Sequence, residues 1–403
     1  MADFAPDYDP SRRTYWPLFR LSPEPRTRRR EANLFGKRTP AAWKHVDLLV
    51  VLCAGAISAL GALMILSSTR GTDPDAYDTT YLSRQVLYIG MGVVAMVLVT
   101  LVDYRRLRDF AWVPYVIAVI LLALVISPVG TERRGAQAWF QIGSFQLQPA
   151  ELAKVITIFA LASLLTRFQV PMAARYVGLG LAVLALPVAL ILAQPDLGTT
   201  LVFVAIAMGM LLVGGVKMRH IIVLTAAGLI AVVGVLDSDL LEDYQRDRLT
   251  VFLDQDTSLR EETWNLNQSK IAVGSGGMMG KGLFEGTQTR LGIVPEQHTD
   301  FIFTALAEEL GFAGSATLLG LFAVLCLRIW RTAQIAGDRL GTLICAGVLS
   351  MFVFQIFQNV GMTVGIMPIT GIPLPFMSYG GSSVIASWVA VGLVLNVHMR
   401  RFG

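Results

Sequence analysis

Charged residues are scarce in this 403-residue chain, since Asp, Glu, Lys and Arg together make up only 15% of it. Soluble domains carry about 25% charged residues, and a soluble chain of this length would form about two or three domains with a large polar surface. Hydrophobic residues instead make up 54% of the sequence. The composition therefore excludes an ordinary cytosolic enzyme, a secreted disulfide scaffold and an intrinsically disordered protein.

Cysteine and histidine are also scarce, with three and four copies. Cys53, Cys326 and Cys345 lie within or at the edge of long apolar runs, which favours small core residues over disulfide partners. No pair of His or Cys has the spacing of metal ligands. The sequence also lacks a nucleophile elbow, a Walker A loop and a dinucleotide fingerprint, which argues against an ATP-driven pump.

Ten long apolar runs dominate the chain. Only helices and closed barrels satisfy their backbone polar groups in lipid, and these runs are continuous, so they predict helices. Most have the length that crosses a hydrocarbon core roughly 30 Å thick. We therefore predict an all-α, polytopic membrane protein with about ten transmembrane helices. The runs are 46–66, 86–101, 110–126, 151–165, 177–193, 197–215, 221–236, 301–327, 340–362 and 382–397.

Basic residues predict the orientation of these helices. Ten Lys and Arg residues precede the first run, and basic residues recur in every second connection after it. Because Lys and Arg concentrate in cytoplasmic connections, this pattern places both termini in the cytoplasm. We predict a disordered, Arg-rich tail over 1–45 and one transmembrane domain over 46–403. Orientation explains most of these charges, and contact of Arg26–Arg30 with anionic lipid or a partner is the alternative.

The longest connection, 237–299, is expected as a large outer loop between the seventh and eighth helices. Residues 237–300 carry twelve acidic and six basic side chains, whereas the tail through Lys44 carries five acidic and ten basic ones. The formal net charge of +4 therefore hides a basic cytoplasmic side and an acidic outer loop. Within this loop, 257–271 is a candidate for a short surface helix.

Ionisable residues near the predicted spans are the candidates for function, because charge is costly in lipid. Glu151 and Lys154 are three residues apart and share a helix face. Asp196 follows a proline just before a predicted helix, and Asp300 stands where the long loop re-enters the membrane. Mutual ion pairing of Glu151 and Lys154, and helix capping by the two aspartates, are the alternatives.

Several motifs closely resemble those of the SEDS proteins, the polymerases of shape, elongation, division and sporulation. The longest is 295–303, which reads Pro-Glu-Gln-His-Thr-Asp-Phe-Ile-Phe and continues at 307–312 with Ala-Glu-Glu-Leu-Gly-Phe. Within the family, this stretch is more similar to the elongation member RodA than to the division member FtsW. Further matching stretches are Trp139, 148–154, 194–199, 268–277, 280–282, 373–376 and 378–383.

The resemblance implies a peptidoglycan glycosyltransferase. Its substrate is lipid II, a disaccharide-pentapeptide on undecaprenyl pyrophosphate, and it acts at the outer side of the bacterial cytoplasmic (inner) membrane. The acceptor 4-hydroxyl attacks the donor's anomeric carbon with inversion, so one base must accept its proton. The pyrophosphate leaves without being protonated, so one carboxylate suffices where a glycosidase uses two. Asp300 stands at the position of the family's essential aspartate and is the predicted general base.

Four basic residues are candidates for binding the pyrophosphate: Lys154, Lys281, Lys270 and Arg134. A lysine acts on phosphate as a point charge and an arginine as a planar fork. Glycines on both sides of Lys281 would also let backbone amides approach an anion. A divalent cation such as Mg²⁺ would serve the same purpose, but no ligand spacing indicates one, so the sequence assigns no cofactor.

The other predicted substrate-binding residues are Trp139, Glu151, Asp196, His298 and Thr299. The indole of Trp139 is suited to stacking on sugar rings or lipid, and anchoring at the membrane interface is its alternative role.

The resemblance also implies protein partners and no nucleic acid. SEDS polymerases work with a class B penicillin-binding protein, the transpeptidase that crosslinks the strands, and a RodA-like member with other proteins of the elongation complex. Two other functions stay open. A lipid II flippase would keep its charges near the bilayer midplane, whereas here they cluster at the outer surface. A non-catalytic scaffold of the cell-wall machinery would not need a buried carboxylate at Asp300.

Overall fold

The computed structural model describes residues 45–69, 78–133, 136–143, 145–236 and 261–402. Each of the ten predicted apolar runs forms a helix within these ranges, which confirms the helical class. The ten helices are α2 (Leu48–Thr69), α3 (Thr80–Leu101), α5 (Trp112–Val125), α6 (Pro149–Leu165), α7 (Ala174–Leu192), α8 (Leu197–Val213), α9 (Met218–Leu236), α13 (Ile302–Ile335), α14 (Arg339–Thr363) and α15 (Gly381–Met399). The Arg-rich tail and the first part of the outer loop lie outside the described residues.

Six helices of the described chain, α2, α3, α7, α13, α14 and α15, are long and apolar enough to cross a membrane by themselves. A seventh span results if α5 is joined to the short helices α4 (Tyr104–Leu107) and η3 (Arg108–Phe110), which meet it at 63°. Helices α6 and α8 have 17 residues each, slightly fewer than the roughly 20 that a span needs. The protein is a polytopic membrane protein, and the count of ten spans remains a prediction.

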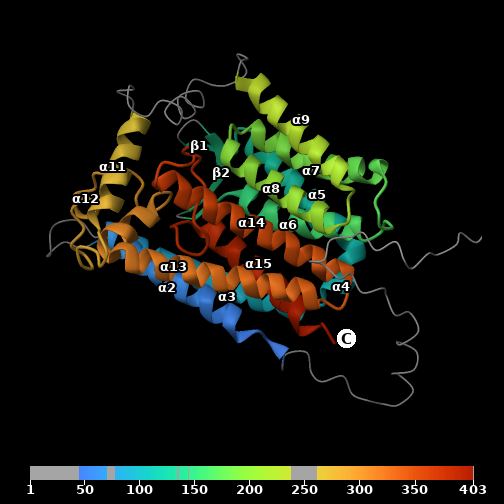
Figure 1. The fold of residues 1–403 in the computed structure, drawn as a ribbon, viewed down its shortest axis with the longest axis horizontal. Helices are drawn as coiled ribbons and strands as arrows, with labels where there is room; N and C mark the ends of the chain where they lie inside the picture. The colour runs from blue at the N-terminus through green and yellow to red at the C-terminus, as the bar shows by residue number, and fades with distance from the viewer. Residues whose placement is uncertain (1–44, 70–77, 134–135, 144, 237–260, 403) are drawn as a thin grey trace, which may run out of the picture. The chain divides into compact units, whose positions relative to one another are not determined.

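Helix α15 is at the centre of the helical packing, because almost all of its residues are buried. Helix α3 lies along it, and glycines on both helices allow the close approach. A Cβ at Gly392 would come within 2.8 Å of the backbone oxygen of Met96, and one at Gly92 within 2.7 Å of the Trp388 side chain. On the other side, α14 packs against α8 and α13, and α13 runs beside α2 (Figure 1).

Helix α13 is broken at Gly311, which has φ +65 and ψ −159. The break frees backbone groups of α13, and the glycine-rich segment 277–282 binds them. Lys281 and Gly282 donate their backbone N–H groups to the oxygens of Glu308 and Glu309, both at 3.1 Å. In return, the N–H groups that follow the break bond to the carbonyls of 277 and 278 at 2.9 and 3.0 Å. Buried backbone groups need such partners, so the segment and the broken helix form one unit.

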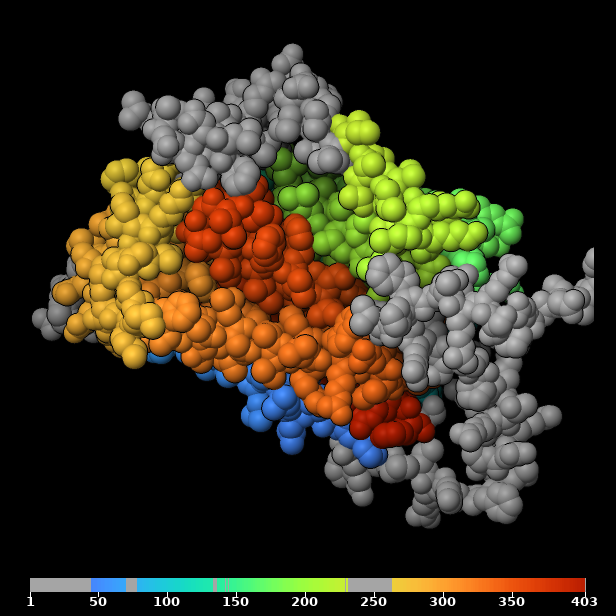
Figure 2. Space-filling model, viewed as in Figure 1, coloured from blue at the N-terminus to red at the C-terminus, as the bar shows by residue number. Residues whose placement is uncertain are grey.

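A small antiparallel sheet between α5 and α6 was not expected from the sequence. It consists of β1 (Thr131–Arg133), β2 (Ala136–Ile142) and β3 (Phe145–Leu147), in the order β1-β2-β3. The described part of the outer loop contains α11 (Glu261–Ser275), which confirms the predicted helix over the described part of 257–271 and extends it to Ser275, and α12 (Thr287–Arg290). Figure 2 shows α11, in yellow, against the orange-to-red end of α14.

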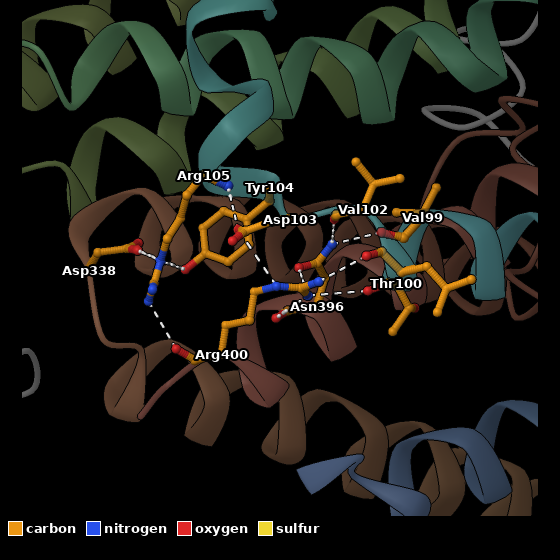
Figure 3. Close-up of polar contacts among 10 residues, drawn as sticks. Val99, Thr100, Val102, Asp103, Tyr104, Arg105, Asp338, Asn396 and Arg400 are labelled. Carbon is orange, nitrogen blue, oxygen red and sulfur yellow. Dashed lines mark hydrogen bonds and ion pairs between the residues drawn. The ribbon is translucent and has the colours of Figure 1, made fainter. Parts of the chain in front are cut away.

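At the other end of the helices, a polar cluster joins α3, α14 and α15 (Figure 3). Asn396 donates to the backbone oxygens of Val99 and Val102 at 2.7 and 2.5 Å. These carbonyls belong to the last turn of α3 and its first following residue, where a helix leaves acceptors without internal partners. Arg105 pairs with Asp338 at 2.6 Å, at the start of α14. The cluster thereby fixes three helix ends on the side where the sequence predicts the cytoplasm.

Candidate active site

A cavity of about 640 Å³ opens between five segments that are far apart in the sequence. They are the first turns of α3, the sheet with the start of α6, the turn between α7 and α8 with the first turns of α8, residues 296–300, and residues 368–383, which join α14 to the first residues of α15. Their charged groups are mainly carboxylates, and tyrosines, a tryptophan and serines complete the lining. Such a mixed lining suits a ligand that has both polar and apolar parts.

Asp300 lines this cavity directly before α13. Its side chain is half-buried, and a Cβ on Gly371 would lie 3.5 Å from its Oδ2, so the carboxylate faces the connection between α14 and α15. Its backbone oxygen accepts a hydrogen bond from the buried side chain of Asn359, at 2.8 Å. Asp300 is therefore held by α14 although it precedes α13 in the chain.

A tight turn shapes the loop that carries Asp300. Glu296 has φ +52, a left-handed conformation that is uncommon for a residue with a side chain. Its backbone oxygen accepts the Thr299 N–H at 3.1 Å, and its carboxylate accepts the Thr299 hydroxyl at 2.8 Å. The backbone oxygen of His298 accepts the Tyr379 N–H at 2.9 Å. These bonds tie the loop to itself and to the connection between α14 and α15.

Three aromatic rings from three different segments form one wall of the cavity. The ring of His298 lies 5.0 Å from that of Tyr81 and 5.7 Å from that of Tyr379, and the two tyrosine rings are 5.2 Å apart. Their tilted and edge-on arrangement is the favourable geometry for aromatic groups. All three residues line the cavity together with Asp300, and aromatic rings in such a lining are suited to packing against sugar rings.

Asp196 also lines the cavity, in the turn between α7 and α8. It caps α8, because its Oδ1 accepts the Thr199 N–H at 2.9 Å and its Oδ2 accepts the Thr199 hydroxyl at 2.7 Å. Its carboxyl is reachable from the cavity yet lies deep among protein atoms. This burial raises the pKa of Asp196, and the bonds from Thr199 and the charge of Lys154 oppose the rise. The predicted cap thus also belongs to the site.

Glu151 and Lys154 form a buried ion pair in the first turns of α6, with 2.8 Å between Oε1 and Nζ. Their side chains are only 3% and 2% exposed. Glu151 lines the cavity, and Lys154 lies behind it without lining it. The pairing that the sequence offered as an alternative is therefore present at the edge of the site.

Six of the predicted site residues meet in this cavity: Trp139, Glu151, Asp196, His298, Thr299 and Asp300. Lys270 does not line it and lies instead against Gly365, where a Cβ would come within 2.3 Å of the lysine Cε. Arg134 lies outside the described residues.

Lys281 does not line the cavity either. Its ammonium pairs with Glu308 at 2.7 Å, and Glu308 also accepts the backbone N–H groups of Gln288 and Thr289, both at 2.9 Å. The expectation that amides around Lys281 would approach an anion is wrong for Lys281 and Gly282, since both N–H groups are bound to the carbonyls of α13. The glycines serve the close contact with the broken helix.

The sequence reasoning missed several lining residues, namely Arg84, Tyr81, Tyr88, Gln148, Tyr379 and Ser382. Gln148, Tyr379 and Ser382 stand inside the matched motifs, which was a usable signal. Arg84 could have been noticed by a different signal, because it is a basic residue at the predicted outer end of a span, where basic residues are less common.

Three or more His, Cys, Asp or Glu side chains that could together hold a metal ion do not occur in the described part of the chain.

The geometry agrees with similarities to known proteins. The family model of FtsW, RodA and SpoVE, described as a cell cycle protein, matches residues 47–402. The peptidoglycan glycosyltransferase MrdB of Escherichia coli K12 is 35% identical over 361 residues, which cover 89% of this chain and 94% of MrdB.

Two solved structures also resemble the chain. The crystal structure of the rod shape determining protein RodA of Thermus thermophilus is 33% identical, with a TM-score of 0.68, and the match covers 90% of this chain and all of RodA. A chain of a peptidoglycan synthase complex, solved to explain how polymerization and crosslinking are coordinated, is 34% identical with a TM-score of 0.75. That match covers 89% of this chain and 98% of the other.

Proposed function

The chain belongs to the FtsW, RodA and SpoVE family, and on that premise we propose that it is a peptidoglycan glycosyltransferase that polymerises lipid II. One observation carries the proposal. Asp300 shares a cavity of about 640 Å³ with Trp139, Glu151 and Asp196, which come from distant parts of the chain. A carboxylate in a cavity with aromatic and polar walls is what a sugar-transfer reaction between two large amphipathic substrates requires.

Asp300 is the proposed general base. It accepts the proton of the acceptor's 4-hydroxyl while that oxygen forms a bond to the anomeric carbon of the donor. The bond from this carbon to the pyrophosphate oxygen breaks on the opposite face, and undecaprenyl pyrophosphate leaves with the electron pair. Because the leaving group is already a stable anion, the reaction needs no general acid, unlike hydrolysis by glycosidases.

The other lining residues would orient the sugars. Trp139 and the aromatic wall of Tyr81, His298 and Tyr379 offer faces on which sugar rings stack. Thr299 fixes the turn that carries Asp300 through its bonds to Glu296. Glu151 and Asp196 offer carboxylate oxygens to the hydroxyl and amide groups of the substrate.

We place the reaction at the outer face of the bacterial cytoplasmic membrane, with a class B penicillin-binding protein as partner. The basic connections support this orientation, and the similarity to a chain of a peptidoglycan synthase complex supports the partner. Other proteins of the elongation complex would join them.

We infer a role in cell elongation and shape, on the RodA-like residues 295–300. Depletion in the host should round rod-shaped cells, and RodA should restore the rods. Filaments after depletion, with rescue by FtsW alone, would assign the protein to division instead.

Polymerisation of lipid II by the protein and its partner tests the proposed activity. The wild type should form glycan strands, and Asp300→Ala and Asp300→Asn should lose strand formation while they retain the thermal unfolding of the wild type. Full polymerisation by both variants would refute Asp300 as the base. Transbilayer movement of lipid II without strand formation would identify a flippase. The absence of both activities would favour a non-catalytic scaffold.

A further inference from the structure

The charges of the cavity are unbalanced. Glu151, Asp196, Glu296 and Asp300 contribute four carboxylates to its lining, and the one Lys or Arg among the described lining residues is Arg84. The proposed donor substrate carries a pyrophosphate, which must enter this acidic cavity with its own negative charge. A cation that faces the cavity is therefore needed to hold it.

Two of the three lysines suggested by the sequence are paired with carboxylates, and the third, Lys270, does not line the cavity. Lys154 is buried against Glu151 at 2.8 Å and does not line the cavity. Lys281 pairs with the buried Glu308 at 2.7 Å, also away from the cavity. To bind a phosphate, each of these two lysines would have to leave a buried carboxylate without its cationic partner, which is unfavourable.

Arg84 is placed differently. It lies in the second turn of α3, on the same helix face as Tyr81 and Tyr88, and all three line the cavity. Its side chain is half-buried. Within the described part of the chain it forms no salt bridge to a carboxylate, so its guanidinium keeps donors for a ligand.

The helix that carries Arg84 is firmly held at this point. The next residue, Gln85, is fully buried and donates its side-chain amide to the backbone oxygen of Ser378 at 3.3 Å. The ring of Tyr88 packs on those of Phe145 and Tyr379, at 5.5 and 6.1 Å. Arg84 therefore extends from a rigid element that contacts the sheet and the connection between α14 and α15.

We propose that Arg84 binds the pyrophosphate of the lipid-linked donor. A guanidinium donates two parallel N–H groups to phosphate oxygens, and its charge does not depend on pH in the physiological range. As the bond between the anomeric carbon and the pyrophosphate oxygen breaks, that oxygen takes the electron pair, and Arg84 stabilises the growing negative charge. The acceptor's proton goes to Asp300. This role rests on the proposed function and adds the group that holds its leaving group.

The test compares Arg84→Gln and Arg84→Lys with a matched control, Arg290→Gln, in the full chain with its partner. Arg290 is exposed at the end of α12 and does not line the cavity. For lipid II, Arg84→Gln should lower kcat/KM about 100-fold or more, with a higher KM and a lower kcat, as for loss of a donor to developing charge. Arg84→Lys should recover part of this loss, and the control should behave as the wild type.

Inhibition by two added lipids separates ligand binding from a structural effect. Undecaprenyl pyrophosphate should inhibit the wild type at a concentration about tenfold or more below that needed for Arg84→Lys, because the lysine lacks the paired donors. For undecaprenyl monophosphate, the inhibitory concentrations for the wild type and Arg84→Lys should differ less. Equal pyrophosphate inhibition of wild type and Arg84→Lys, or wild-type kcat/KM in Arg84→Gln, would overturn the role of Arg84.

Direct binding keeps this inference distinct from the proposed function. Labelled undecaprenyl pyrophosphate should bind the wild type and Arg290→Gln more tightly than the folded Arg84→Gln, whose thermal unfolding is measured in parallel. If the wild type binds this lipid through Arg84 but makes no strands, the proposed function fails and the anion site stands. If the wild type makes strands and Arg84→Gln binds the labelled lipid as tightly as the wild type does, only the inference about Arg84 fails.

Discussion

Asn359 donates its side-chain amide to the backbone oxygen of Asp300 at 2.8 Å and to that of Ile372 at 2.8 Å. The side chain is fully buried in α14. One amide thus joins the residue proposed as the base to the connection that forms another wall of the cavity. The position of Asp300 depends on a residue that does not face the substrate.

Replacement of Asn359 by Leu should therefore impair catalysis by displacing Asp300. Two buried carbonyls would lose their donor, at a cost of about 1–3 kcal/mol in the free energy of unfolding. We expect kcat to fall about 10-fold to 100-fold, since small misplacement of a reacting group has such effects. Strand formation and thermal unfolding are measured together, with Gln358→Leu as a control, because its amide bonds to Pro368 and not to Asp300. Equal kcat losses in the two variants would contradict a specific role.

Removing both charges of the buried pair of Glu151 and Lys154 should restore stability without restoring activity. Glu151→Gln or Lys154→Met alone leaves one buried charge unpaired, which costs about 3–5 kcal/mol. The double variant removes both charges and should recover most of the stability. If Glu151 also binds substrate, the double variant stays inactive although it folds. Recovery of full strand formation in the double variant would show a purely structural pair.

The glycine-rich segment should tolerate substitution according to its contact with α13. Gly280 has φ +80, and its Cβ would lie 2.1 Å from the backbone oxygen of Glu309. Gly280→Ala should therefore destabilise the protein by about 2–4 kcal/mol, from backbone strain and overlap together. Gly274→Ala is the matched control, since it lies in α11 and its Cβ would meet nothing within 4 Å. Similar unfolding temperatures for both variants would contradict the close contact between the glycine-rich segment and α13.

Lys281 should affect stability more than substrate binding. Lys281→Met removes the partner of the buried Glu308, whose carboxylate keeps three hydrogen bonds from Gln288 and Thr289. We expect a loss of about 1–3 kcal/mol and an unchanged KM for lipid II, because Lys281 lies outside the cavity. A raised KM with unchanged thermal unfolding would instead support the pyrophosphate role that the sequence suggested for this lysine.

Asp196 should make the stability of the protein depend on pH. Burial raises its pKa in the folded state, so the folded protein binds this proton more tightly than the unfolded chain does. The ionised carboxylate then costs stability above the folded pKa, and the cost vanishes as the pH falls below the ordinary value. Asp196→Asn should gain thermal stability relative to the wild type as the pH rises from acid to neutral. If the wild type instead gained thermal stability relative to Asp196→Asn as the pH rises, the raised pKa of Asp196 would be contradicted.

The Asp196 variant should also lose activity, because the carboxylate faces the cavity. A gain in stability with a loss of function is typical of residues that are retained for activity. Strand formation at neutral pH provides the measurement, and wild-type rates would remove Asp196 from the site.

The membrane helices could be predicted because their signal is local. The lipid bilayer requires long apolar helices, and Lys and Arg gather in the connections on the cytoplasmic side. The sequence was therefore sufficient to predict helices such as those at residues 48–69 and 381–399. The small sheet of β1, β2 and β3 was not predicted, since strands of three to seven residues carry too little pattern to stand out in the sequence. The break at Gly311 was also hidden, because a glycine within an apolar run is compatible with an unbroken helix.

The sequence by itself determined the helical membrane class of the protein and, through its motifs, the family. It also singled out Asp300, Glu151 and Asp196 as charges that are costly in a membrane. Only the tertiary structure decided which of these charges meet. Lys154 and Lys281 are bound to carboxylates, whereas Arg84 faces the cavity. The physical reason is that pairing is decided by distances of about 3 Å between side chains far apart in the chain, and composition and spacing do not contain those distances.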